Sequence, residues 1–224
     1  MKINNVYYSI ILLFITIFPI IAFAEEKSSI SNYTSPSSSS SSSSNNTNVD
    51  FATNIEFIKS NLSAAISNKQ AGNNEITQTH TFPPRSEIYT LIRDQLSSAD
   101  NELNKTLIDS LKNLTSIVIK STPAELADSA ASVESLLNKA KIIVIPENEI
   151  GDIKFNMSTL INLLKTAEFE YYIGIANGTI TNISEYQNPH GFVSSANELL
   201  NKTTNSLNHT LVSNLSKILL QELH

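Results

Sequence analysis

The sequence predicts an all-α fold, an antiparallel bundle of about five or six helices that follows a signal peptide and a disordered Ser-rich stalk. Two observations lead to this prediction. From Phe51 onward, apolar residues recur at intervals of three and four, the period of a helix with one buried face. The 224 residues also include only 5 Gly and no Cys, so the domain must depend on its apolar core without disulfide bonds.

Residues 1–24 have the organisation of a secretory signal peptide. Lys2 provides a positive charge, residues 6–23 are uncharged and mostly apolar, and Ala22-Phe23-Ala24 has the small-x-small pattern of a cleavage site. The alternative is an uncleaved anchor, because this stretch nearly reaches the length that spans a bilayer. In both cases we expect the rest of the chain to be extracytoplasmic, either secreted or held at the cell surface.

Residues 25–49 are polar and of low complexity, and they include an unbroken run of serines from Ser37 to Ser44. Such a segment cannot bury enough apolar surface to offset the entropy lost on ordering. We therefore predict a disordered linker before a helical bundle domain over residues 50–224.

The first predicted helix spans about residues 53–79, with Gly72-Asn73 weakening its last turns. Pro83-Pro84 ends or kinks it, because proline lacks an N–H and restricts the residue before it. A second helix begins near Ser86. A third, over about residues 100–119, repeats leucines and a valine at helical spacing.

The fourth helix has the clearest predicted start. Thr122-Pro123-Ala124-Glu125 is a capping box with Pro at the first helical position. This helix extends to about Ala140. The β-branched run 142–145 is predicted to be an extended buried connector that ends at Pro146.

The last two predicted helices form a hairpin. One spans about residues 153–177 and stops at Asn177-Gly178. Asn182 to Glu185 resembles a capping box, and the helix that follows extends to about Leu220 with a kink at 189–191. Its predicted buried stripe consists of Val193, Ala196, Leu200, Leu207, Leu211, Leu215 and Ile218.

Eleven Asn-x-Ser/Thr sequons occur in the chain, and none has Pro at the middle position. In an exported protein each is a candidate for N-glycosylation. Asn214 falls in the apolar sector of the last helix, so we expect it to remain unmodified. The other candidates are Asn32, Asn45, Asn61, Asn104, Asn113, Asn156, Asn177, Asn182, Asn201 and Asn208.

Charge and motifs disfavour two classes of function. The net charge is −6 and there is no Lys/Arg cluster, so nucleic acid is not expected as a partner. The chain has no Gly-x-Ser-x-Gly elbow, phosphate loop or His-Glu-x-x-His pattern, so we predict that it is not an enzyme and holds no cofactor.

A speculative metal site is the alternative. Glu170 and His190 lie at similar distances along the chain from the turn between the last two helices, so they have roughly the same height in the hairpin. A carboxylate and an imidazole can bind iron or copper if another helix, for example near His80, completes the site. Surface or capping roles are the simpler interpretation of these residues.

One pattern resembles a known family. The residues that carry it are Glu170-Tyr171, Gly174, Asn177-Gly178, Ile180, Glu185-Tyr186, Phe192 and Ala196. They resemble the helical hairpin of extracytoplasmic domains associated with iron permeases. Related archaeal secreted proteins are similar over a longer span, where a His precedes a Pro as His80 precedes Pro83 here.

This resemblance implies two antiparallel helices and a role in metal uptake or its sensing. The positions that match the family pattern are Glu170, Tyr171, Gly178, Glu185 and Tyr186. The chain departs from the family because it lacks the membrane-embedded permease with its acidic transport motif, and because Pro189-His190 interrupts the second helix. Transport itself is therefore not implied.

The sequence thus predicts a non-enzymatic, secreted or surface-tethered helical bundle that binds a protein or contributes to the cell envelope. Its membrane contact would be only through the N-terminal segment, if that segment is uncleaved. The alternative is a metal-binding accessory domain for iron or copper uptake.

Overall fold

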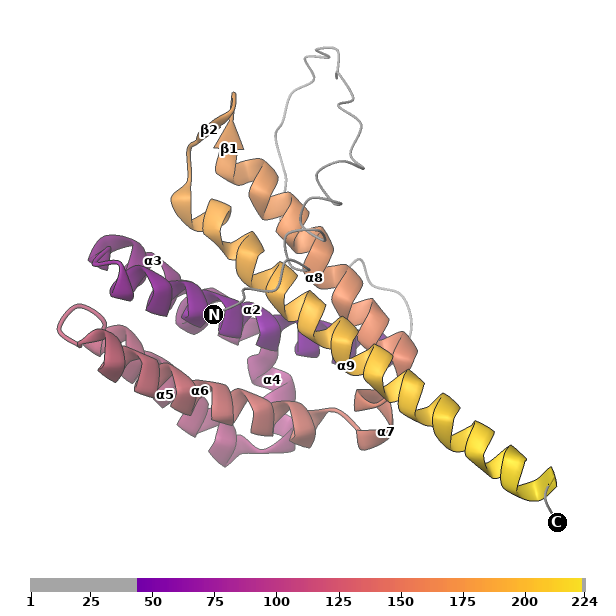
Figure 1. The fold of residues 1–224 in the computed structure, drawn as a ribbon. Coiled ribbons are helices and arrows are strands. Elements are labelled where there is room, and N and C mark those ends of the chain that lie inside the picture. The colour runs from indigo at the N-terminus through magenta and orange to yellow at the C-terminus, as the bar shows by residue number, and fades with distance from the viewer. Residues whose placement is uncertain (1–43, 223–224) are drawn as a thin grey trace. The chain divides into compact units, whose positions relative to one another are not determined.

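The computed structural model describes residues 44–222, with side chains described for residues 47–205 and 207. The predicted signal peptide, most of the predicted linker and Asn32 lie outside the described residues. The described part is almost entirely helical, which confirms the all-α prediction, and one short β-hairpin is the exception (Figure 1).

Helix α2 (Ser44–Gln70) begins before the predicted start of the domain at residue 50. Val49 is already part of the core, and this burial explains why the helix extends back into the predicted linker. The predicted single helix over 53–79 is wrong. The chain turns at Gly72, where φ is +79°, and α3 (Asn74–Pro83) begins immediately afterwards.

The two prolines do not interrupt the helical path. A π-helical segment, η1 (Pro84–Ile88), follows α3 and leads directly into α4 (Tyr89–Ala99). The backbone N–H of Tyr89 donates to the carbonyl of Pro84, as the wider π-helical turn allows. The prediction of a stop and a new start near Ser86 is therefore wrong.

The next two helices begin where the sequence predicts. At the start of α5 (Asn101–Ile117), the Asp100 carboxylate accepts hydrogen bonds from the backbone N–H groups of residues 102 and 103. Helix α6 (Pro123–Val144) has the predicted capping box, with Glu125 N–H to Thr122 Oγ1 at 3.2 Å and Thr122 N–H to Glu125 Oε2 at 2.8 Å.

Helix α6 ends at Val144, so the extended connector predicted for 142–145 is wrong for its first three residues. Ile142 is 70% exposed, because the helical path turns this side chain toward solvent, whereas Ile145 is buried. A single helical turn, α7 (Glu147–Ile150), follows Pro146 and was not predicted.

The final helical hairpin consists of α8 (Ile153–Gly174) and α9 (Ile183–Glu222). Helix α8 ends before the predicted residue 177, because the chain forms strands β1 (Ile175–Ala176) and β2 (Thr179–Ile180). Asn177 and Gly178 have φ values of +53° and +72°, which suit a two-residue loop between antiparallel strands. Asn177-Gly178 therefore closes a β-hairpin instead of capping a helix.

Helix α9 begins at the predicted cap, where Asn182 Oδ1 accepts from the backbone N–H groups of residues 184 and 185. It continues through Pro189. Its buried face includes Phe192 and Ala196, whereas Val193 and Leu200 are exposed, so part of the predicted stripe is wrong. Leu211, Leu215, Ile218 and Asn214 have side chains outside the described residues.

The described domain contains two apolar clusters. The larger one joins α2, α4, α5 and α6 around residues such as Ile58, Leu107 and Leu137, and it includes Phe155 at the start of α8. The smaller one lies between α8 and α9 and comprises Leu163, Ala167, Phe192 and Ala196, with Phe57 of α2 packed against it. These two helices lie antiparallel and side by side (Figure 1).

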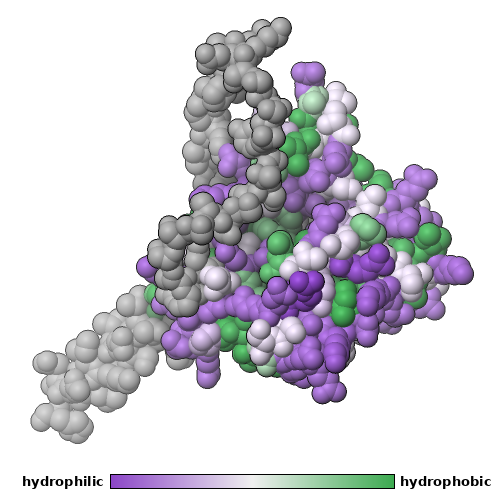
Figure 2. Space-filling model, turned by 180° about the vertical axis from the view of Figure 1, so that it is seen from behind, coloured by the Kyte–Doolittle hydropathy of each residue, from purple (hydrophilic) through white to green (hydrophobic). Residues whose placement is uncertain are grey.

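The surface is mixed on the face that Figure 2 shows, where hydrophobic residues lie among hydrophilic ones. No helix in the described residues combines the length and the apolar content that crossing a bilayer requires.

Candidate functional site

A polar cluster lies where the start of α9 meets α2 and α3. The His80 side chain is fully buried, and its Nε2 lies 2.8 Å from Oε1 of Gln187. Asn68 Nδ2 donates to the same Gln187 oxygen at 2.8 Å. Since this oxygen can only accept, His80 Nε2 carries the hydrogen and Nδ1 is the acceptor of the neutral ring. Nδ1 has no hydrogen-bond partner among the described residues.

Helix α8 brings Glu170 to the same region. Its Oε2 atom is buried without a hydrogen-bond partner in the described structure. Gly174, one turn later, allows the close approach of the two helices, because a Cβ atom there would lie 2.8 Å from the backbone N of Tyr186. A larger residue at this position would separate α8 from α9 and expose the carboxyl group.

Asn188 connects the two groups. It is 8% exposed, and its Oδ1 atom is buried without a partner in the part of the chain that is described. Its amide lies near enough to both His80 and Glu170 to affect the pKa of each. Three helices therefore bring to this region three side chains that each carry a buried polar atom without a partner: His80, Glu170 and Asn188.

Burial changes the protonation of the cluster. It raises the pKa of Glu170 to about 8, with a smaller contribution from the charge of Glu185 and an opposing one from Asn188. Burial also lowers the pKa of His80, although the neighbouring Gln187 and Asn188 side chains oppose this change. At neutral pH the carboxyl group is mostly protonated and the imidazole is neutral, so the cluster carries little charge.

The structure places the three predicted metal ligands in different environments. Glu170 and His80 both lie next to Asn188, whereas His190 is exposed, with its ring edge-on to Tyr186 at 6.5 Å between centroids. No group of three or more His, Asp and Glu side chains suited to a metal ion occurs within the described residues. Sequence reasoning missed Gln187 and Asn188, because no spacing pattern distinguishes buried amides from exposed ones.

The aromatic residues of the hairpin have two roles. The Tyr171 and Tyr186 rings pack across α8 and α9, with 5.9 Å between their centroids. Phe169 and Tyr172 point toward solvent, and Tyr172 is 76% exposed. Of these four aromatic side chains, Tyr171 and Tyr186 therefore contribute to hairpin packing.

Two of the candidate glycosylation sites are buried. The Asn61 amide donates to the carbonyl of Phe57, and Asn104 Oδ1 accepts from the Tyr89 hydroxyl at 2.8 Å. A glycan on either residue would break these contacts and would not fit in the core. Burial therefore disfavours glycosylation of Asn61 and Asn104 in this fold. Candidates such as Asn113 and Asn201 are exposed.

Comparison with protein families supports the resemblance at the hairpin. Residues 146–223 match the family described as the iron permease-associated 4-helix bundle domain. The match covers α7, α8, β1, β2 and all of α9, and does not cover α2 to α6. Comparisons with curated proteins and with solved structures give no match.

Proposed function

We propose that this chain is a non-enzymatic, extracytoplasmic accessory protein that binds a protein partner of the cell envelope through its α8–α9 hairpin. The match to an iron permease-associated domain supports a context of iron uptake. The predicted export signal supports the location. The chain would act in that context by binding.

The observation that carries this proposal is the outward side of α8. Residues 161, 165, 168 and 172 recur at intervals of four and three, so they lie on the side opposite Leu163 and Ala167, which pack against α9. This outward side and its flanks expose large apolar side chains, namely Ile161, Leu164, Phe169 and Tyr172. Aromatic side chains exposed on one side of a helix are typical of protein interfaces.

A photo-crosslinking amino acid at position 172 tests this proposal in native cells. We expect one crosslinked envelope protein, identified by mass spectrometry. The same amino acid at Ser135, an exposed position of α6, should give no such product. If position 172 gives no product, or gives the same products as position 135, the proposed interface is wrong.

A second candidate function is metal binding by the polar cluster. The observation that favours it is the set of three buried atoms without partners on His80, Glu170 and Asn188. Imidazole nitrogen and carboxylate or amide oxygen suit borderline metals such as iron, copper or zinc. Binding would require Glu170 to release its proton, so metal affinity should increase with pH.

Metal retention separates this candidate from a purely structural cluster. Purified protein is dialysed against iron, copper or zinc at pH 8, and its metal content is measured by mass spectrometry. Near-stoichiometric retention is expected for the natural chain and for His190→Gln, and loss is expected for Glu170→Gln. Equal metal content in the natural chain and Glu170→Gln would contradict metal binding at this cluster.

A further inference from the structure

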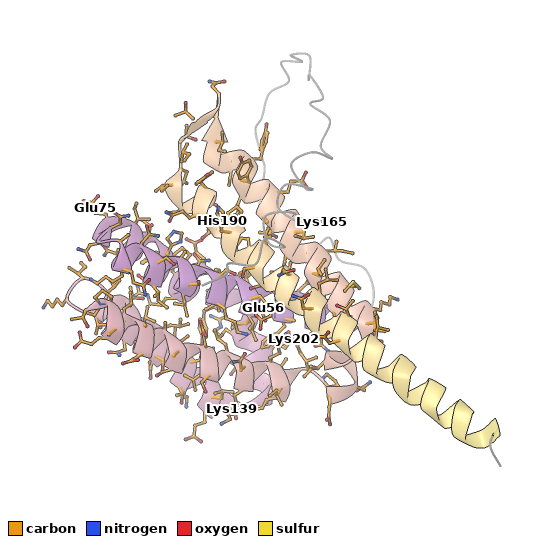
Figure 3. All side chains as sticks on the ribbon, viewed as in Figure 1. Glu56, Glu75, Lys139, Lys165, His190 and Lys202 are labelled. Carbon is orange, nitrogen blue, oxygen red and sulfur yellow. The ribbon has the colours of Figure 1, made fainter. Side chains whose placement is uncertain are left out.

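A cleft of about 650 Å³ lies between α2, α6 and α9, and it is separate from the polar cluster. Its walls carry lysines from each of these helices: Lys59, Lys141 and Lys202. Figure 3 labels Lys202 of α9, Glu56 of α2 and Lys139 of α6, and of these three only Lys202 and Glu56 line the cleft.

Two of the lysines share one carboxylate oxygen. Lys59 Nζ lies 3.3 Å from Oε1 of Glu56, and Lys141 Nζ lies 3.5 Å from the same atom. Both distances exceed the roughly 2.8 Å of a compact charge-assisted hydrogen bond. The lysine side chains are only 21% and 19% exposed. Glu56 can balance only one of these two positive charges. The other ammonium group has no carboxylate of its own, although its environment is partly dehydrated.

The third lysine acts on the same region. Lys202 Nζ lies 3.0 Å from Oε1 of Glu198. The Lys202 hydrogen bond and charge lower the pKa of Glu198, and the charges of Lys59 and Lys141 add to this effect. The three ammonium groups thus act on one exposed carboxylate, Glu198, and the walls as a whole carry as many glutamates as lysines. Glu134 is a further carboxylate of the wall.

The cleft also contains an unused hydroxyl group. Ser60 lies on its wall and is 3% exposed, and its Oγ atom has no hydrogen-bond partner among the described side chains. Gly191 of α9 packs directly on it, since a Cβ atom at position 191 would lie 2.6 Å from Ser60 Cβ. A buried hydroxyl without a partner is uncommon in folded proteins, but this atom has almost no exposed surface and lies against Gly191, so a ligand in the cleft cannot reach it in this structure.

We propose that this cleft binds an oxyanion, a phosphate or carboxylate group, through the ammonium groups of Lys59, Lys141 and Lys202. The ligand oxygens would accept hydrogen bonds from lysine N–H groups that do not bond to Glu56 or Glu198. Glu198 is the internal competitor, because its carboxylate already pairs with Lys202 at 3.0 Å. This inference does not rest on the proposed partner or metal function.

Calorimetric titration of the full chain with inorganic phosphate and with citrate tests the proposal. Saturable binding of either anion is expected, and the tighter one identifies the class of ligand. Lys141→Met should weaken binding at least about tenfold, which is the scale of one hydrogen bond to a charged group. Lys139→Met, a neighbour on α6 that does not line the cleft, should bind as the natural chain does.

A second variant keeps the test decisive if Lys141→Met does not fold. Glu198 is 68% exposed, so Glu198→Gln should preserve the fold, and it should tighten anion binding because the competing carboxylate is gone. The proposal is overturned if neither anion binds. It is also overturned if folded Lys141→Met binds as tightly as the natural chain, or if Glu198→Gln weakens binding.

Discussion

Glu170 shows how strongly a local environment changes the chemistry of one residue. Its spacing in the sequence is compatible with an exposed acid, a metal ligand or a residue of the hairpin interface. In the fold its carboxyl group is buried beside Asn188, and burial raises its pKa to about 8. The folded state therefore binds a proton at a pH at which the unfolded chain has released it, and this difference affects stability.

We expect Glu170 to reduce stability as pH rises. Its pKa is higher in the folded state than the ordinary value of 4.5, so the stabilising contribution of the proton is complete below about pH 4.5 and is lost as pH rises to about 8. The free energy of unfolding should fall by about 2–4 kcal/mol between pH 5 and 9 because of this group.

Chemical denaturation at several pH values measures this effect. The side chain in Glu170→Gln carries no charge at any pH, so this variant should flatten the dependence of the unfolding free energy on pH. Glu168→Gln, a change at an exposed neighbour, should leave that dependence as it is in the natural chain. Identical pH profiles for the natural chain and Glu170→Gln would show that the carboxyl group is not buried as described.

At the scale of elements, the α8–α9 hairpin depends on two glycines for different reasons. Gly174 is helical and lies against the backbone of α9, where a Cβ atom would be 2.8 Å from Tyr186 N. Gly178 has open space around it but a φ of +72°, which other residues adopt at a cost. An alanine substitution therefore tests the close helix contact at position 174 and the backbone conformation at position 178.

We expect Gly174→Ala to lower the melting temperature more than Gly178→Ala. The first forces α8 and α9 apart, whereas the second costs only about 1 kcal/mol for the left-handed conformation. Gly178→Val should cost more than Gly178→Ala, since a β-branched side chain fits this conformation poorly. Thermal unfolding followed by circular dichroism measures the order, and a reversed order for the two alanine variants would contradict the close contact at Gly174.

At the scale of the whole described domain, the stabilising apolar contacts fall into two clusters. The larger cluster holds α2, α4, α5 and α6 together, and the smaller one joins α8 to α9 and to Phe57 of α2. The smaller cluster has few fully buried side chains, so the hairpin should open at a lower free energy than the rest.

Hydrogen exchange of paired core variants tests this division. Phe192→Ala should cost about 3–5 kcal/mol in the hairpin and accelerate exchange in α8 and α9 while α5 stays protected. Leu107→Ala, in the larger cluster, should accelerate exchange in α5 and α6 as well. Equal acceleration throughout after Phe192→Ala would indicate a single cooperative unit.

The sequence by itself determined the helical class and the helix starts at Asp100, Thr122 and Asn182. These features depend on the chain's own periodicity and on hydrogen bonds between residues two or three apart, so no distant contact is needed to establish them. Resemblance at the hairpin was also readable from the sequence, because the match extends over residues 146–223.

Only the tertiary structure decided the features that depend on distant contacts. The chain stays helical through Pro83 and Pro84 because a π-helical turn and packing against α2 and α5 override the local preference of proline. Glu170 and His80 meet at Asn188 because Gly174 lets two helices approach, and the lysines of the cleft come from three separate helices. Burial and the resulting pKa values depend on these contacts, and periodicity along one chain segment cannot specify them.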